Sequence, residues 1–393
     1  MSTKQSYDAA VLALRMQRGD ALGQVRAAAR EDARFVAAHQ LEAWILLSSR
    51  DLRQFRAAGH VRNRLVGMPM SRHEGLHAAA ITVATGGDYA AAVRLLDRIV
   101  AEYPRDLVAL MMAHVLDYYV GDTEALLRRS SRALPHWSPA DPAYHTVLGL
   151  HAFALEESGD YAAAESAAKQ ALELEPRDIR AHHVVTHVLE MQGRADEGIH
   201  WMGARSAWWT GGGASSTHLW WHLALHQLEL GRERLALEVY DRRLHGGALS
   251  ELIDAASLLW RLHLTGYDVG GRFAPLAARW EPYAEDAHCA FNDLHAMMSF
   301  VGAGRWDLVE RLLAAQARRV ARPYGANHDM TRLAGLPAAR ALAAYGRQDY
   351  AQTEAILRAL PPVAHRIGGS HAQRDVLQLT RAAAAQRRPK KAA

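Results

Sequence analysis

The stretch GDYAAAESAAKQALELEPRD, residues 159–178, carries the start and stop signals of a single helix. Gly159 and Asp160 are suited to end one helix and cap the next, and Pro176 precedes a second capping aspartate, Asp178. The alanines between these marks let neighbouring helices pack closely. We therefore predict one helix of a packed helical hairpin here.

The same signals recur along the chain at a regular pitch. Glycines 87, 121, 159, 193 and 231 are separated by 34, 38, 34 and 38 residues, and later marks stand at Gly304 and Gly346. The related stretches YPRD (103–106) and EPRD (175–178) lie 72 residues apart, which is two repeats. This pitch is typical of tetratricopeptide-type hairpins. We predict an all-α fold, a strongly curved tetratricopeptide-type α-solenoid, with one repeat domain over 1–385 and a basic, disordered tail over 386–393.

Composition agrees with stacked helices. The chain has 393 residues, of which 50% are hydrophobic and 22% charged, which excludes a disordered chain. The single cysteine, Cys289, allows no intramolecular disulfide or cysteine-based zinc site and fits a reducing compartment. No stretch has the length and apolarity of a membrane span. We expect a cytoplasmic protein without membrane contact.

Charge argues against a nucleic-acid partner. The 46 basic residues nearly balance 42 acidic ones, and arginines are interleaved with acids rather than gathered on one face. The heavy use of arginine and alanine indicates a GC-rich genome, and we expect a bacterial source. More unusual are the 22 histidines.

Six histidines follow the repeat. They are separated by 38, 37, 37, 36 and 35 residues, and each precedes the glycine mark of its hairpin: His39, His77, His114, His151, His187 and His222. First helices line the concave side of such solenoids, so the pattern predicts a histidine-lined groove. Descent of the repeats from one hairpin would give the same pattern, so the phase argues for a common surface rather than for chemistry.

Two adjacent helices add further histidines to this row. His183, His187 and Glu190 share one helical face, and His218, His222 and His226 share another. Two imidazoles four residues apart can hold zinc, so His183, His187 and His218 form a candidate metal trio. Against it, the glutamate of the HExxH motif is missing. We expect no cofactor, with zinc as the alternative.

Two motifs in the second half carry further polar groups. Asn292, Asp293 and His295 fall within one helical turn. Residues 368–375, GGSHAQRD, predict a turn followed by a helix, where Ser370 and Gln373 form a capping box. The free amides there, with Arg374, are suited to receive an anion. The loop over 208–217, with three glycines in succession, is a connector or a candidate lid.

The chain resembles the tetratricopeptide repeat protein 38-like family over nearly its whole length. The resemblance rests on residues 72–77 (RHEGLH), 183–191, 218–222, 240–241, 291–295 and 368–375. It places on family positions His39, His77, His114, His183, His187, Glu190, His218, His222, Asn292, Asp293 and His295. His151, His226 and His371 depart from the family pattern. The resemblance implies a tetratricopeptide solenoid and no settled reaction.

Three functions remain open. In the first, the groove binds a small polar molecule or short peptide through His39, His77, His114, Glu190, Asn292, Ser370, Gln373 and Arg374. In the second, the protein is an enzyme, such as a metal-dependent acyl or amide hydrolase, with His187, His222, Asp293 and His295 as its acids and bases. In the third, it is a scaffold for protein-protein interaction. We place binding of some kind above catalysis.

Overall fold

The computed structural model describes residues 2–244 and 247–388. Within those residues the secondary structure is helical and no strand occurs. The prediction of an all-α, tetratricopeptide-type helical repeat is confirmed. Two compact units divide the chain: the first contains residues 1–189 and 201–216, and the second contains 190–200 and 217–393.

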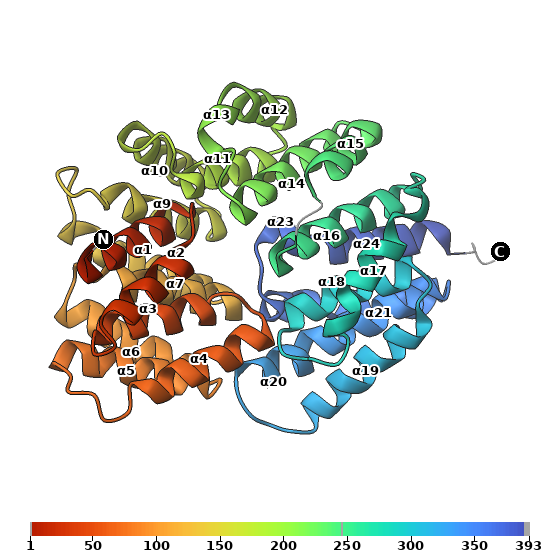
Figure 1. Cartoon of the computed structure of the whole chain (residues 1–393). Coiled ribbons are helices and arrows are strands. Elements are labelled where there is room, and N and C mark those ends of the chain that lie inside the picture. Colours follow the sequence, from red (N-terminus) through yellow and green to blue (C-terminus); the bar gives the residue numbers. More distant parts are fainter. Residues whose placement is uncertain (1, 245–246, 389–393) are drawn as a thin grey trace. The chain divides into compact units, whose positions relative to one another are not determined.

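The first unit begins as five helical hairpins, coloured red to yellow-green in Figure 1. They pair α1 (Thr3–Met16) with α2 (Ala21–Glu31), α3 (Val36–Leu47) with α4 (Leu52–Arg64), α5 (Arg72–Thr85) with α6 (Tyr89–Glu102), α7 (Leu107–Val120) with α8 (Thr123–Ala133), and α9 (Tyr144–Glu157) with α10 (Tyr161–Leu174). The helix α11 (Ile179–Met191) follows, and residues 201–216 return to this unit with α13 (Ser206–Trp209).

The repeat marks act as the sequence predicts. The glycines at 87, 121, 159, 193 and 231 all have positive φ, between 67° and 86°, and each lies between two helices. The following aspartate caps the next helix in several hairpins, as Asp160 does by accepting the amide of Ala163 at 3.1 Å. Left-handed backbone costs glycine little, so glycine recurs at these helix ends.

The loop predicted over 208–217 is shorter in the structure, because α13 ends at Trp209 and the next helix, α14 (Ala214–Glu229), begins at Ala214. Residues 210–213 are non-helical and are held in place. Arg18, just beyond α1, donates to the carbonyl oxygens of Trp208 and of Thr210, the latter at 3.0 Å. The amide of Gly212 donates to Oγ of Ser216 at 2.7 Å, and a side chain at 212 would meet Ile179. The segment just after α1 therefore anchors this loop within the first unit, as a packed connector would be anchored.

The second unit is also helical. It contains α14 (Ala214–Glu229) from Thr217 onward, α15 (Glu233–Arg243), α16 (Leu249–Thr265), α17 (Phe273–Trp280), α18 (Ala290–Gly302), α19 (Trp306–Val320), α20 (Ala326–Met330), α21 (Leu336–Gly346), α22 (Tyr350–Ala359), α23 (His371–Arg374) and α24 (Val376–Arg387). The helix α12 (Ala195–Ala204) begins in this unit and ends in the first.

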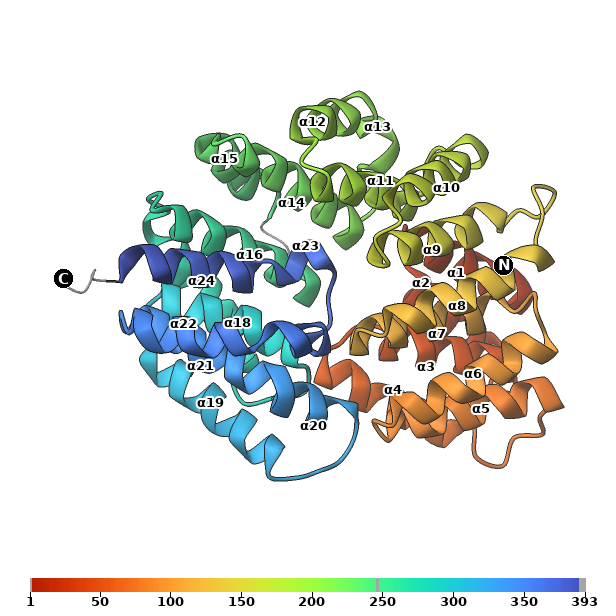
Figure 2. The ribbon, with the colours of Figure 1, turned by 180° about the vertical axis from the view of Figure 1, so that it is seen from behind.

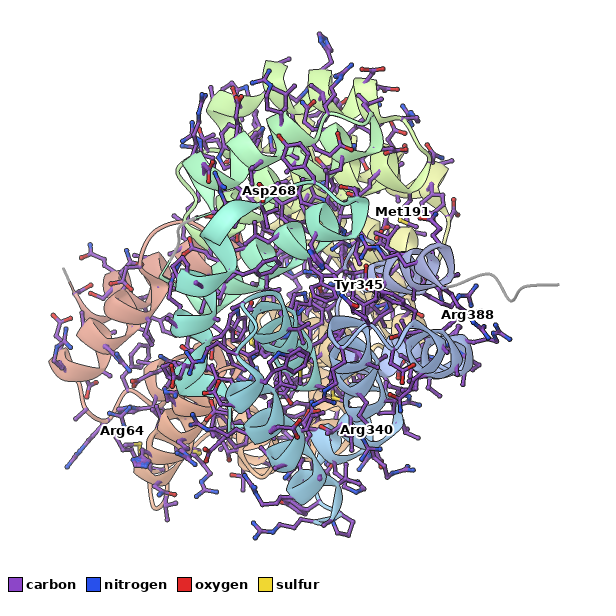
Figure 3. All side chains as sticks on the ribbon, turned by 90° about the vertical axis from the view of Figure 1, so that its right-hand side faces the viewer. Arg64, Met191, Asp268, Arg340, Tyr345 and Arg388 are labelled. Carbon is purple, nitrogen blue, oxygen red and sulfur yellow. The ribbon has the colours of Figure 1, made fainter. Side chains whose placement is uncertain are left out.

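The last helix of the second unit packs against an early one. Figure 2 shows α24 beside both α16 and α22. The indole N–H of Trp260 donates to Oγ1 of Thr380 at 2.9 Å, and Arg261 forms an ion pair with Asp375. In Figure 3, Tyr345 lies among the packed side chains of this unit, and Arg388 lies at the end of α24. Residues 389–393 of the predicted tail lie outside the described residues.

Gly346 differs from the other marks. Its neighbour Gln348, rather than the glycine, has positive φ, at 63°. A side chain at 346 would approach Cγ1 of Val301 to 2.3 Å. The hairpin of α21 and α22 is confirmed, and its glycine is required by close helix packing instead of by the turn.

Candidate functional site

A cavity of about 1390 Å³ lies within the first unit. Its wall comes from α1, α3 and α5, from the connection between α6 and α7, and from residues 136–143. Much of it is apolar, and Leu12 of α1 remains 47% exposed there. Small-molecule pockets usually measure about 300–1,000 Å³, so this cavity can hold a larger ligand.

Two histidines and an aspartate form the polar part of the wall. His73 and His77 lie one turn apart on α5, and Asp106 caps the start of α7. Nε2 of His73 is 2.6 Å, and Nε2 of His77 2.7 Å, from the same oxygen, Oδ2 of Asp106. The other oxygen, Oδ1, accepts the amide of Ala109 at 2.8 Å. The His73 side chain is 38% exposed, whereas that of His77 is 6% exposed.

The tautomer of His77 follows from Trp44 on α3. The indole nitrogen of Trp44 lies 3.2 Å from Nδ1 of His77, and an indole N–H can only donate. Nδ1 therefore carries the lone pair, and Nε2 carries the proton that it donates to Asp106. A metal ion would need the lone pair of Nε2, so the Trp44 contact opposes metal binding by this trio, although its ligand atoms lie within 4.8 Å of one another.

Asp106 is held as an anion. Burial alone would raise the pKa of this carboxyl, but the hydrogen bonds from His77, Ala109 and His73 outweigh burial and lower its pKa. The pKa of the Tyr7 phenol, at the same cavity wall, shifts in the opposite direction. Burial, then the charges of Asp106 and Asp8, raise the pKa of Tyr7 to about 12. The cavity wall thus holds an anionic Asp106 and a neutral Tyr7 phenol.

The same histidine-aspartate pair recurs two repeats later in a closed setting. His145 and Asp178 are again 33 residues apart, and Nδ1 of His145 lies 2.6 Å from Oδ2 of Asp178. His145 is only 5% exposed. The position that corresponds to His77 is Gly149, where a side chain would meet Arg180. The second copy therefore has a structural role, and the half-exposed His73 distinguishes the first.

The six phased histidines do lie on first helices, as the sequence predicts, but at drifting positions. His39 is the fourth residue of α3, whereas His187 is the ninth residue of α11. Five of the six side chains are buried. His39 lies 3.0 Å from the carbonyl oxygen of Ala33, and burial, then the charges of Arg180 and Arg129, lower the pKa of His114 to about 3.

The predicted metal trio is divided between the units. His183 and His187 belong to the first unit, where their ring centroids are 4.3 Å apart. His218 belongs to the second, where its Nδ1 lies 2.8 Å from Oδ1 of Asp254. Also in the second unit, Nδ1 of His222 lies 2.7 Å from Oε2 of Glu190.

The two motifs of the second half come together in the second unit. Gly369 has φ of 82°, and a side chain on it would approach Cε2 of Phe291 to 2.3 Å, so the glycine turn packs directly on α18. Gln373 accepts the amide of Ser370 at 3.0 Å, which is the reciprocal bond of the predicted capping box. Arg374 donates to the carbonyl oxygen of Gly369, within its own turn.

The polar side chains of α18 are buried. Asn292 is 8% exposed, and Asp293 accepts a hydrogen bond from Nε2 of Gln316 at 3.1 Å. Burial raises the pKa of Asp293 to about 7, against the lowering effect of Gln316 and with a further rise from Asp286. Nδ1 of His295 lies 2.7 Å from the carbonyl oxygen of Phe291. The candidate catalytic residues of this unit, His222, Asp293 and His295, thus have different hydrogen-bonding partners.

Sequence reasoning missed His73, Asp106 and Trp44 as members of a site. Residues 72–77 stand out as a motif and Asp106 as a helix cap, but neither prediction places His73 next to Asp106. The available signal is the spacing of 33 residues from His73 to Asp106, repeated from His145 to Asp178. The sequence carries no such signal for Trp44.

No family model matches the chain. Among solved structures, a chain of the APC/C hetero-tetramer Cut9–Hcn1 is 13% identical, with a TM-score of 0.39, over 87% of this chain and 62% of that one. The human IFIT1 dimer with m7Gppp-AAAA is 14% identical, with a TM-score of 0.36, over 91% of this chain and 90% of that one. The P58(IPK) TPR domain is 13% identical, with a TM-score of 0.24, over 99% of both chains. With TM-scores below 0.5, these likenesses carry no weight for function.

Proposed function

We propose that this protein is a peptide-binding helical-repeat module whose first unit takes a short peptide segment into its cavity. The observation that carries the proposal is the half-exposed imidazole of His73 beside exposed apolar surface at one cavity wall. Leu12 is 47% exposed and Trp137 is half-buried, and both line the same cavity as His73. Apolar surface of this kind favours an apolar ligand side chain.

The chemistry of His73 specifies the polar part of the ligand. In its neutral form, His73 donates from Nε2 to Asp106, which leaves the lone pair of Nδ1 to accept a hydrogen bond. A backbone N–H of a peptide is such a donor. The anionic Asp106 behind the ring strengthens its acceptor character, as a carboxylate does for any imidazole that it orients. A peptide with one apolar side chain next to an unpaired backbone N–H would contact the apolar surface and donate to Nδ1 of His73.

The size of the cavity favours a peptide over a single metabolite. Its volume of about 1390 Å³ exceeds that of ordinary small-molecule pockets. Several charged groups at its wall already have partners: Arg105 pairs with Asp141, and Glu102 binds Arg72 at 2.5 Å. Such groups are suited to form a polar rim around an apolar centre, which is the usual anatomy of a peptide or protein interface.

The test is calorimetry with peptides selected on the full chain from a displayed library. We expect His73→Phe to weaken binding by about tenfold, since one hydrogen bond to the ligand is lost. The matched control is His60→Phe, at an exposed position of α4 that does not line the cavity. It should bind like the wild type. Equal affinities of wild type and His73→Phe would refute the proposal.

A further inference from the structure

A second group of titratable side chains lies in the first unit and does not line the cavity. Glu156 and Glu157 are the last two residues of α9, and His187 lies on α11. Their exposed fractions are 0%, 4% and 0%. One ligand atom from each lies within 4.8 Å of the other two. Two carboxylates and an imidazole are thus brought together in the interior, away from solvent.

The setting is electrostatically unfavourable for two carboxylates. Both stand at the C-terminal end of a helix, where the helix dipole is negative and favours cations. Neither carboxylate oxygen of Glu156 has a hydrogen-bond partner among the described residues, although its side chain is completely buried. Nδ1 of His187 lies 3.4 Å from its Oε2, too long for a normal charge-assisted bond. A buried carboxylate without donors is costly unless it takes up a proton or a cation is bound.

We propose that Glu156, Glu157 and His187 bind a divalent transition-metal ion. Two carboxylates and one imidazole are a ligand set that suits zinc, manganese or iron(II). A doubly positive ion would balance both carboxylates and the dipole at the end of α9. The set retains His187 from the trio predicted from the sequence and replaces the other two histidines by glutamates.

The burial of all three ligands indicates a structural role. The ion would link α9 to α11, two successive first helices of the repeat, and would enter as the protein folds. The trio at the cavity does not compete for it, since Trp44 keeps the proton on Nε2 of His77. This inference does not rest on peptide binding, because its residues do not line the cavity.

The experiment uses the untagged full chain and zinc ions as the probe. The protein is unfolded in urea together with a chelator, and the chelator is then removed. It is refolded with excess zinc chloride and dialysed, and its metal content is measured by elemental analysis. We expect about one equivalent of zinc in the wild type and a higher melting temperature than in protein refolded without metal. Refolding with cobalt should give visible absorption bands from the bound ion.

The variant Glu156→Gln keeps the shape of the side chain and removes its charge. It should lose at least about tenfold in zinc affinity, as loss of a ligand predicts. The matched control is Glu42→Gln, a buried glutamate of the same unit whose carboxylate is paired with Arg26 and Arg64. Any zinc bound by the wild type should remain in this control.

Two results would overturn the proposal. Zinc retained by folded Glu156→Gln at wild-type affinity would place the ion elsewhere. Wild-type protein that refolds in zinc and retains none would show that the three residues hold no metal, and this result needs no variant. Circular dichroism verifies that each variant is helical, and Glu157→Gln replaces Glu156→Gln if the latter does not fold.

Discussion

The indole N–H of Trp44 and Nδ1 of His77 lie 3.2 Å apart, and this contact determines which nitrogen of His77 carries the proton. Since the indole can only donate, His77 donates from Nε2 to Asp106 at 2.7 Å. Asp106 in turn binds the half-exposed ring of His73. Three helices, α3, α5 and α7, thereby fix one polar wall of the cavity.

Replacing Trp44 by phenylalanine should remove the donor to Nδ1 of His77 and leave Asp106 alone to hold the proton on Nε2. The variant keeps an aromatic ring, so the cavity wall stays filled. We expect Nε2 to stay protonated, the Nδ1 signal of His77 to shift in nitrogen NMR spectra, and a loss of stability of about 1–3 kcal/mol. Trp306→Phe, in the second unit, is the control and should leave the His77 signals unchanged. An unchanged Nδ1 signal in Trp44→Phe would contradict the hydrogen bond from Trp44.

The lowered pKa of Asp106 predicts a loss of stability in acid. Its pKa is lower in the folded than in the unfolded chain, so its contribution is present above the unfolded value of about 3.9 and is lost as the pH falls through the folded value. Urea unfolding between about pH 6 and about pH 3 should show a steeper loss in the wild type than in Asp106→Asn. Parallel curves for the two proteins would exclude this role of Asp106.

Asp293 should have the opposite dependence on pH. Burial raises its folded pKa to about 7, so between about pH 4 and that value the folded chain binds more protons and stability falls as the pH rises. We expect Asp293→Asn to be more stable than the wild type at about pH 8, by up to about 4 kcal/mol, and little changed at about pH 4. Urea denaturation at the two values measures the difference. If Asp293→Asn were less stable than the wild type at both pH values, the carboxylate of Asp293 would be required for stability.

Gly369 is the position where the glycine turn leaves no room for a side chain. Its φ of 82° and the 2.3 Å approach to Phe291 both oppose substitution. Gly369→Ala should lose more than about 2 kcal/mol of stability. Gly271→Ala, where a side chain would meet nothing within 4 Å, should change stability by less than about 0.5 kcal/mol. Equal melting temperatures of the two variants would contradict the close approach.

Local signals explain how much of the fold was predictable. Gly159 followed by Asp160 specifies a helix end and a cap through local geometry. The glycine recurs at a regular pitch and the aspartate follows it in several repeats, so the hairpins follow from the sequence. Gly346 shows the limit: it looks like the other marks, but packing against Val301 and not the turn requires it. Packing between distant helices leaves no comparable local pattern.

The candidate site was less predictable for the same reason. The phase of the histidines placed His77 on a first helix, but its function depends on Trp44, 33 residues earlier, and on Asp106, 29 residues later. Glu156 and Glu157 resemble ordinary solvent-facing glutamates in the sequence. Only the packing of α9 and α11 shows that they are buried.

Hydrogen-deuterium exchange of the full chain with and without a selected peptide tests peptide binding by the cavity most directly. Exchange should slow in residues 72–77 and 102–108, which supply the His73, His77 and Asp106 wall, and along α1 at Leu12. Protection confined to residues 217–388, or an absence of protection with a peptide that binds in calorimetry, would contradict the account.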